Sequence, residues 1–204
     1  MTDLGRRALM AGAAGLGLAL TIDACTGHDD GDRGQASAYS GQYRLIALSA
    51  ALENQAVSFY RALLTAQRGG KLGPPVPALA SLAQACAAQH AAHAQAWNAI
   101  LHAAGRPVIT GVPLTSQAKV MRDLKAATGG SAACAIAVQL EDQAAQTFAA
   151  AAAEVSSTRA VTVAASIAPV EAMHAAVLRL ILGEIPVPAS FPGQPPASPH
   201  DLTA

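Results

Sequence analysis

The feature that most constrains the fold is a repeat that places ionisable residues where a hydrophobic core is expected. Residues 52–56 read Leu-Glu-Asn-Gln-Ala, and residues 140–144 read Leu-Glu-Asp-Gln-Ala. Downstream of the first copy lies His-Ala-Ala-His at 90–93, and downstream of the second lies Glu-Ala-Met-His at 171–174. Each half therefore supplies a lone Glu and a pair of metal-binding residue types. This pattern predicts an all-α fold, an antiparallel four-helix bundle with a carboxylate/histidine site between facing helices.

The spacing of apolar residues predicts four long helices, over residues 43–67, 78–104, 131–156 and 159–182. Their apolar stripes are interrupted near the middle by six candidate metal ligands, Glu53, His90, His93, Glu141, Glu171 and His174. Residues 105–130 are too many for a tight hairpin and predict a long crossover between the second and third long helices. Within the crossover we expect a short amphipathic helix over 116–127, with Thr115 as its N-cap and Gly129-Gly130 as its stop.

The charge balance of the expected core points to a bound cation. Burying an unpaired carboxylate costs several kcal/mol. Between residues 43 and 182 there are six Asp or Glu, three of them on the stripes, and no Lys or Arg lies on a stripe near them. A divalent cation would supply the missing positive charge. The alternative is a metal-free core in which Glu and His hydrogen-bond to each other, and the residues alone leave both readings open.

The first residues predict export rather than a part of the fold. Arg6-Arg7 precede an apolar run over 8–22, and residues 1–25 resemble a twin-arginine signal peptide. Ile22-Asp23-Ala24-Cys25 resembles a lipobox, which predicts lipidation of Cys25 and a membrane anchor. The alternative is a free or buried Cys25 in an ordinary exported protein. In both cases the expected location is the cell envelope, as an anchored lipoprotein or an extracytoplasmic protein.

The remaining segments complete the expected organisation. A flexible tether over 26–41 leads into a helical domain over 42–185, and a Pro-rich, non-helical tail over 186–204 packs along the surface or frays. The 13 basic and 13 acidic residues balance, and no basic stripe with interleaved aromatics is present, which argues against a nucleic-acid partner and leaves a homodimer open. Cys86 and Cys134 face the core, and we expect two buried thiols rather than a disulfide.

From Glu53 to about Phe191 the chain resembles the exported bacterial ferritin-like domain proteins. The most specific stretches are Gln139-Leu-Glu-Asp-Gln-Ala-Ala, Pro169-Val-Glu-Ala-Met-His-Ala-Ala-Val-Leu and Gly183-Glu-Ile-Pro-Val-Pro. In the iron-binding members of that superfamily, two lone Glu and two E-x-x-H motifs bind a dinuclear centre. The resemblance implies terminal carboxylates at Glu53 and Glu141 and imidazole ligands at His93 and His174. It also implies a bridging carboxylate at Glu171.

One position departs from that pattern, because His90 stands where a second bridging Glu is expected. A neutral imidazole does not bridge two metals, so a mononuclear site or an asymmetric pair becomes as plausible as a symmetric dinuclear centre. The expected function is binding of iron or manganese, with reactivity toward oxygen or peroxide. Tyr60, two turns beyond Glu53, is either a redox-active neighbour or a core Tyr. The competing hypothesis is a non-enzymatic, lipid-tethered structural or stress-related bundle without metal.

Overall fold

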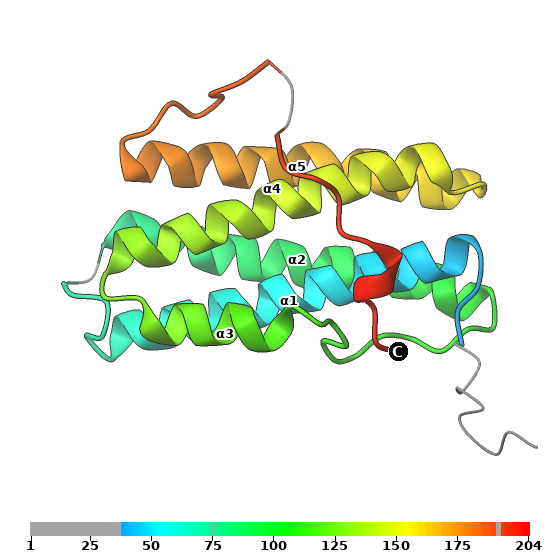
Figure 1. Ribbon diagram of the computed structural model, residues 1–204, viewed down its shortest axis with the longest axis horizontal. Helices are drawn as coiled ribbons and strands as arrows, with labels where there is room; N and C mark the ends of the chain where they lie inside the picture. The colour runs from blue at the N-terminus through cyan, green and yellow to red at the C-terminus, as the bar shows by residue number, and fades with distance from the viewer. Residues whose placement is uncertain (1–37, 75, 191–192) are drawn as a thin grey trace, which may run out of the picture. The chain divides into compact units, whose positions relative to one another are not determined.

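Alanine-rich segments with few internal breakers form the long helices of this protein, since Ala has the highest intrinsic helix propensity. The computed structural model describes residues 38–74, 76–190 and 193–204. The elements are α1 (Gln42–Arg68), α2 (Pro77–Ala103), α3 (Gln117–Ala126), α4 (Gly130–Glu154), α5 (Thr158–Leu182) and the 3₁₀ turn η1 (Pro199–Asp201) (Figure 1). The described residues contain no β-strand beyond one isolated bridge, Leu114 with Leu202. Each α-helix begins and ends within two residues of its predicted range.

Local chemistry sets several helix ends. Pro77 opens α2, where its missing N–H has no intrahelical partner to lose. The Ser157 side chain caps α5 by accepting a hydrogen bond from the Ala160 N–H at 3.1 Å. Gly183 closes α5 with φ 77°, a left-handed conformation that suits glycine. Pro169 lies inside α5, and the helix continues through it.

The four long helices pack in two pairs, α1 with α2 and α4 with α5. The pairs are joined by contacts of α1 with α4 and of α2 with α5, while α3 packs on α1 and α4 (Figure 1). In Figure 1, α1 and α5 run in one direction and α2 and α4 in the other. The segment between α2 and α4, which includes α3, therefore returns along the length of the long helices before α4 begins.

The polar residues of the repeat lie between two separate apolar clusters. One cluster holds Ile46 and Leu48 of α1 with Trp97, Phe148 and Ile167. The other cluster contains Phe59, Leu63, Leu79, Cys134 and Leu178. Each long helix contributes residues to both clusters, and the one or two predicted ligands that it carries lie between those two sets of residues. The repeat thus places one polar layer at mid-height of an otherwise apolar core.

Three local expectations are wrong. Thr115 does not cap α3: Ser116 precedes the helix, and the Thr115 hydroxyl donates instead to Asp201 Oδ1 at 3.3 Å. Gly130 does not stop α3 but is the first residue of α4. The tail is not free of helix, because Ser198 caps the 3₁₀ turn η1 with a capping box. At Thr115 a contact with Asp201, distant in sequence, replaces the expected cap, and in the tail the local capping box of Ser198 starts a helical turn.

Two sequence expectations remain outside this description. The predicted signal peptide over 1–25, its Cys25 and most of the predicted tether lie outside the described residues. Within them, α5 is the helix long and apolar enough to cross a membrane by length and composition, with mean hydropathy 1.6. Its Glu171 and His174 are buried against the other long helices, which is typical of a core helix.

Candidate metal centre

The six predicted ligands converge in the polar layer. Glu53 comes from α1, His90 and His93 from α2, Glu141 from α4, and Glu171 and His174 from α5. Their carboxylate and imidazole atoms form two overlapping groups, in each of which all ligand atoms lie within 4.8 Å of one another. The first group is Glu53, His90, His93 and Glu171, and the second is His90, Glu141, Glu171 and His174. His90 and Glu171 belong to both.

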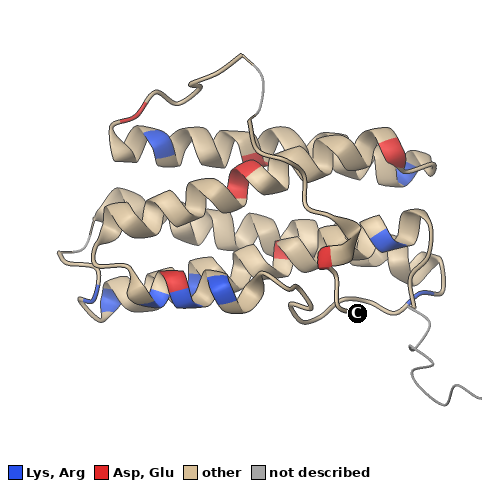
Figure 2. Ribbon diagram, in the orientation of Figure 1, with Lys and Arg blue, Asp and Glu red and all other residues tan. Residues whose placement is uncertain are grey.

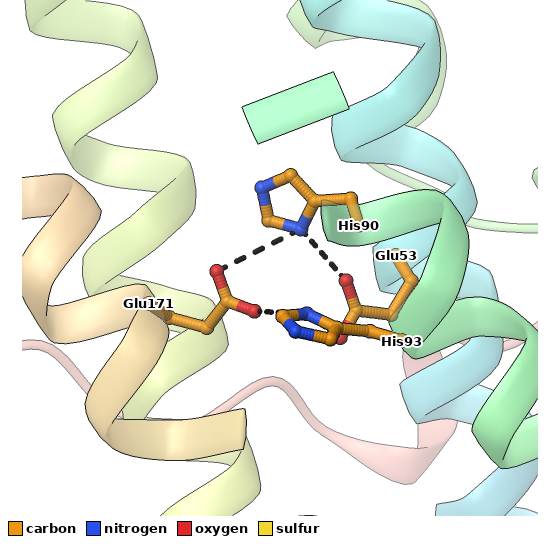
Figure 3. Close-up of side chains that lie close together, drawn as sticks. All are labelled: Glu53, His90, His93 and Glu171. Atoms are coloured by element: carbon orange, nitrogen blue, oxygen red, sulfur yellow. Dashed lines mark hydrogen bonds and ion pairs between the residues drawn. The ribbon is translucent and has the colours of Figure 1, made fainter. Parts of the chain in front are cut away.

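His90 lies at the centre of the cluster with its two ring nitrogens facing different carboxylates. Its Nδ1 is 2.7 Å from Glu53 Oε2 and 3.7 Å from Glu171 Oε2 (Figure 3). Its Nε2 is 3.2 Å from Glu141 Oε1. A neutral imidazole carries a proton on one nitrogen and a lone pair on the other. His90 can therefore offer a lone pair to one group while its N–H donates to a carboxylate of the other.

The first group contains buried polar atoms without a hydrogen bond. His93 Nδ1 lies 2.9 Å from Glu171 Oε1 and 3.5 Å from Glu53 Oε1, but none of these three atoms makes a hydrogen bond (Figure 3). They account for three of the five buried side-chain N and O atoms that make no hydrogen bond in the described residues, although His93 forms ion pairs with both carboxylates. A buried polar atom without a hydrogen bond costs about 1–3 kcal/mol. These three atoms converge from three helices, an arrangement that fits a cation which displaces the His93 proton.

The second group is satisfied by protein contacts. Glu141 Oε1 accepts a short hydrogen bond from the Tyr60 hydroxyl. His174 Nδ1 lies 3.1 Å from Glu171 Oε2, and its Nε2 lies 2.5 Å from Gln89 Oε1. The Tyr60 ring stacks on His90 at 5.6 Å between ring centroids. This half of the cluster is thus held in place by residues outside the six ligands.

The histidines are basic in the metal-free protein. Burial by itself lowers the pKa of an imidazole, but the surrounding carboxylates outweigh it here. The pKa of His90 lies well above its usual range, and the pKa of His93 rises to about 9. The Cys86 thiol and the carboxylates raise the pKa of His174 to about 12 against the effect of burial. Three imidazolium ions can therefore balance three carboxylates, and the absence of Lys and Arg does not by itself require a metal.

The carboxylates differ in their surroundings. Burial raises the pKa of Glu141, but the positive charges of His90 and His174 outweigh it and hold that pKa far below its usual range. Burial dominates at Glu171 and raises its pKa. The pKa of Tyr60 is raised by burial and by the nearby Glu141 charge, so its hydroxyl stays protonated as a donor.

Three neighbours of the cluster were missed or left undecided by the sequence analysis. Gln89 contacts His174. Nothing in the sequence around Gln89, which directly precedes His90, indicated this contact. Cys86 is buried one helical turn before His90 and contacts His174 and Tyr60. Tyr60 is a buried Tyr whose hydroxyl is paired, as one of the two readings expected. Cys86 and Cys134 are both buried free thiols, as predicted.

A helical protein with a buried carboxylate/histidine cluster in its core is thus defined by the fold and the site. The model of the ferritin-like domain family matches residues 41–184, and the chain belongs to this family. No curated protein and no solved structure matches the chain. The family and the buried His/Glu cluster agree with metal binding as the type of function.

Proposed function

We propose that this protein is an envelope-located ferritin-like metal-binding protein that holds iron or manganese in the first group and reacts with oxygen or peroxide. The observation that carries the proposal is a set of three buried atoms without a hydrogen bond, Glu53 Oε1, Glu171 Oε1 and His93 Nδ1, that face one another. In native proteins nearly all buried polar atoms have a hydrogen-bond partner. Their convergence from three helices is the arrangement expected of metal ligands.

The donor set suits a first-row divalent metal. Glu53 and Glu171 supply carboxylate oxygens, and His90 Nδ1 and His93 Nδ1 supply imidazole nitrogens. Imidazole with carboxylate is typical of iron, manganese and zinc sites, whereas a site for Ca²⁺ or Mg²⁺ would be all oxygen. When bound, such a metal supplies Lewis-acid and redox chemistry to the core.

One metal in the first group is favoured over two equal metals. With its lone pair directed from Nδ1, His90 keeps a proton on Nε2 and donates it to Glu141 at 3.2 Å. Glu141 is also held by Tyr60, so it has little need of a cation. The shared residue Glu171 allows a second, weaker metal in the second group.

The open edge of the cluster lies between α2 and α5. The His93 side chain is 16% exposed and that of His174 8%, whereas those of Glu53 and Glu171 are fully buried. Small reactants would therefore arrive beside His93, and the Glu side chains stay shielded from water. At this edge His93 would help to hold the metal.

The finer architecture and the location are part of the same proposal. The four long helices would form the antiparallel bundle of the ferritin-like fold, with the segment between α2 and α4 as its crossover, a reading supported by helix directions and by α3 packing on α1 and α4. The twin-arginine-like residues and the lipobox-like Cys25 support export and anchoring.

A metal-free structural role is the second candidate. It is favoured by the direct contact of His90 with Glu53 at 2.7 Å and of His174 with Glu171 at 3.1 Å, which let imidazolium and carboxylate groups satisfy each other. In that case the polar layer fixes helix register.

Metal content and the absorption spectrum of protein purified from its own envelope distinguish the two candidates. We expect close to one iron or manganese per chain. Protein that is metal-poor after gentle purification, gains no metal on addition of Fe²⁺ or Mn²⁺, and becomes more stable when Glu53 and Glu141 are both replaced by Leu would establish the structural role.

A further inference from the structure

The surface charge of the protein is unevenly distributed. A basic patch, defined here as six exposed residues of the α1 end, the following loop and α3, comprises Arg61, Arg68, Lys71, Lys119, Arg122 and Lys125. Figure 2 shows these cations gathered over α3 and the adjoining end of α1. Residues 61–71 and α3 contain a single acidic residue, Asp123, which pairs with Lys119 at 2.6 Å. The patch therefore carries a clear positive excess.

Packing fixes the patch as a rigid surface. Leu124 of α3 is buried in the core, so the charged side of this amphipathic helix faces outward. Gln55 donates hydrogen bonds to Ser116 and Gln117 at 3.1 Å, which joins the start of α3 to α1. The Lys71 ammonium donates to the Lys125 carbonyl at 2.7 Å, which joins the loop to the end of α3.

We propose that the basic patch docks on an anionic lipid bilayer and orients the protein there. A Lys or Arg close to an anionic surface contributes enough for roughly a five-fold gain in binding. The patch contains no aromatic side chain on which nucleic-acid bases could stack, so lipid headgroups suit it better than nucleic acid. Docking through the basic patch requires neither metal binding in the first group nor the proposed reaction with oxygen or peroxide.

The membrane anchor predicted from the sequence is compatible with docking through the patch. The tether predicted over 26–41 would span about 20–24 Å. The start of α3 lies beside Ser58, to which Gln117 donates a hydrogen bond, and Ser58 is about 24 Å along α1 from Gln42. If Cys25 is lipidated as predicted, a tether of this length would let the same bilayer contact α3.

Docking through α3 would leave the candidate metal centre open to water. α3 packs on α1 and α4, whereas the exposed edge of His93 lies on the other side of the long helices, between α2 and α5. The patch would thus turn the entrance of the site away from the lipid.

The lysines of the chain offer a direct test, because all three, Lys71, Lys119 and Lys125, belong to the patch. We would label the full chain with a water-soluble amine-reactive reagent in the presence of phosphatidylglycerol/phosphatidylcholine vesicles or of phosphatidylcholine vesicles, and read each lysine by mass spectrometry. We expect protection on the anionic vesicles alone, lost as salt is raised, because the Debye length falls below about 8 Å above physiological ionic strength.

A pair of charge-matched variants controls for net charge. Arg61→Gln with Arg68→Gln and Arg122→Gln keeps the reporter lysines and should weaken docking on the order of 100-fold, which restores lysine reactivity. Ser81→Asp with Gln84→Glu and Arg159→Gln alters exposed positions elsewhere by the same net charge, and should keep the protection. Circular dichroism would verify that both variants are folded.

The proposal is overturned if the lysines are protected equally on neutral vesicles, or if their protection survives in the patch variant. It is also overturned if the matched control loses protection as much as the patch variant does. Stronger protection by a single-stranded oligonucleotide than by the anionic vesicles would also overturn it and assign the patch to nucleic acid.

Discussion

The two halves of the repeat carry nearly the same motif but leave their ligands in different states. In the half formed by α4 and α5, Glu141 accepts a hydrogen bond from Tyr60, and His174 contacts Gln89. In the half formed by α1 and α2, Glu53 Oε1 and His93 Nδ1 have no hydrogen bond. Two ligand candidates of the α1–α2 half thus keep an atom without a hydrogen bond, whereas in the α4–α5 half only Glu171 Oε1 does.

The difference has an origin in two positions of the repeat. His90 stands where the other half has Glu171, which removes one negative charge. Tyr60 stands where the other half has Phe148, and the Phe148 ring packs against Trp97 without a hydroxyl to donate. The repeat fixes the position of each ligand, and neighbours from the facing helices decide whether that ligand remains available to a metal.

The largest effect is expected at the residue that both groups share. Glu171→Gln removes a carboxylate from both groups and should lower metal affinity more than about 100-fold, beyond the 10–100-fold loss typical of residues that only support a ligand. Isothermal titration with Fe²⁺ or Mn²⁺ measures the affinity. Glu154→Gln, an exposed carboxylate at the end of α4, is the control and should bind like the parent protein.

A comparison of the two lone carboxylates tests the asymmetry directly. Glu53→Gln should weaken metal binding at least about ten-fold more than Glu141→Gln, because Glu141 is already paired within the protein and outside the first group. The same titration applies to both variants. Equal losses for the two would show that the halves bind metal as equals, and the preference for the first group would have to be abandoned.

A substitution that makes the two halves more alike should change the number of metal ions bound per chain. His90→Glu restores a second carboxylate that can bridge, and we expect two irons per chain instead of one, measured by elemental analysis after Fe²⁺ loading. The metal-free variant should be less stable, because it buries one more carboxylate and one imidazolium fewer. His102→Glu, at an exposed position of α2, controls for the added charge. A destabilised His90→Glu variant without extra iron would refute the dinuclear reading.

As pH rises, the free energy of unfolding of the metal-free protein should fall, whereas the affinity for metal should increase. The pKa of His93 rises from 6.5 to about 9 on folding, so its stabilising charge is present below about 6.5 and is lost as pH rises through about 9. The free energy of unfolding of metal-free protein should fall over that window, as followed by urea titration with a chelator present. Metal affinity should rise over the same window, since binding displaces the imidazolium protons. A stability that is flat between these values would contradict the charged state of the cluster.

The smallest effect is expected at the hydroxyl that separates the halves. Tyr60→Phe removes the donor to Glu141 and should cost about 1–3 kcal/mol of unfolding free energy. It should also free Glu141 for a second metal. The converse change, Phe148→Tyr, introduces a hydroxyl at the equivalent position of the other half and should lower metal affinity if that hydroxyl reaches Glu53. Denaturant unfolding and metal titration of both variants provide the measurement.

Much of the fold follows from local patterns in the sequence. The apolar period predicted all five helices, because a helix with one apolar stripe must bury it against a neighbour. The position of the six candidate ligands in the core was predicted for the same reason, since Glu and His within such a stripe are forced inward. Two local details were not predicted: Thr115 pairs with Asp201, far along the chain, instead of capping α3, and Ser198 with Asp201 forms the capping box of η1.

The chemical state of the site was beyond local patterns. Nothing near Gln89 indicates that its amide meets His174, and the spacing of Tyr60 from Glu53 does not reveal that its hydroxyl meets Glu141. Each of these contacts joins different helices, and its existence depends on side-chain direction at the packed interface. The basic patch is similar: its charges lie in two separate segments, and only the packing of α3 on α1 unites them.

The sequence by itself determined which residues face the core and at what height along each helix, because helical periodicity and the cost of burying charge are local properties. Only the tertiary structure decided which of those residues hydrogen-bond to protein neighbours and which do not. Hydrogen bonds and pKa shifts depend on atoms brought within a few ångströms by packing. Two nearly identical motifs therefore differ: Glu141 and His174 hydrogen-bond to Tyr60 and Gln89, whereas Glu53 Oε1 and His93 Nδ1 make no hydrogen bond.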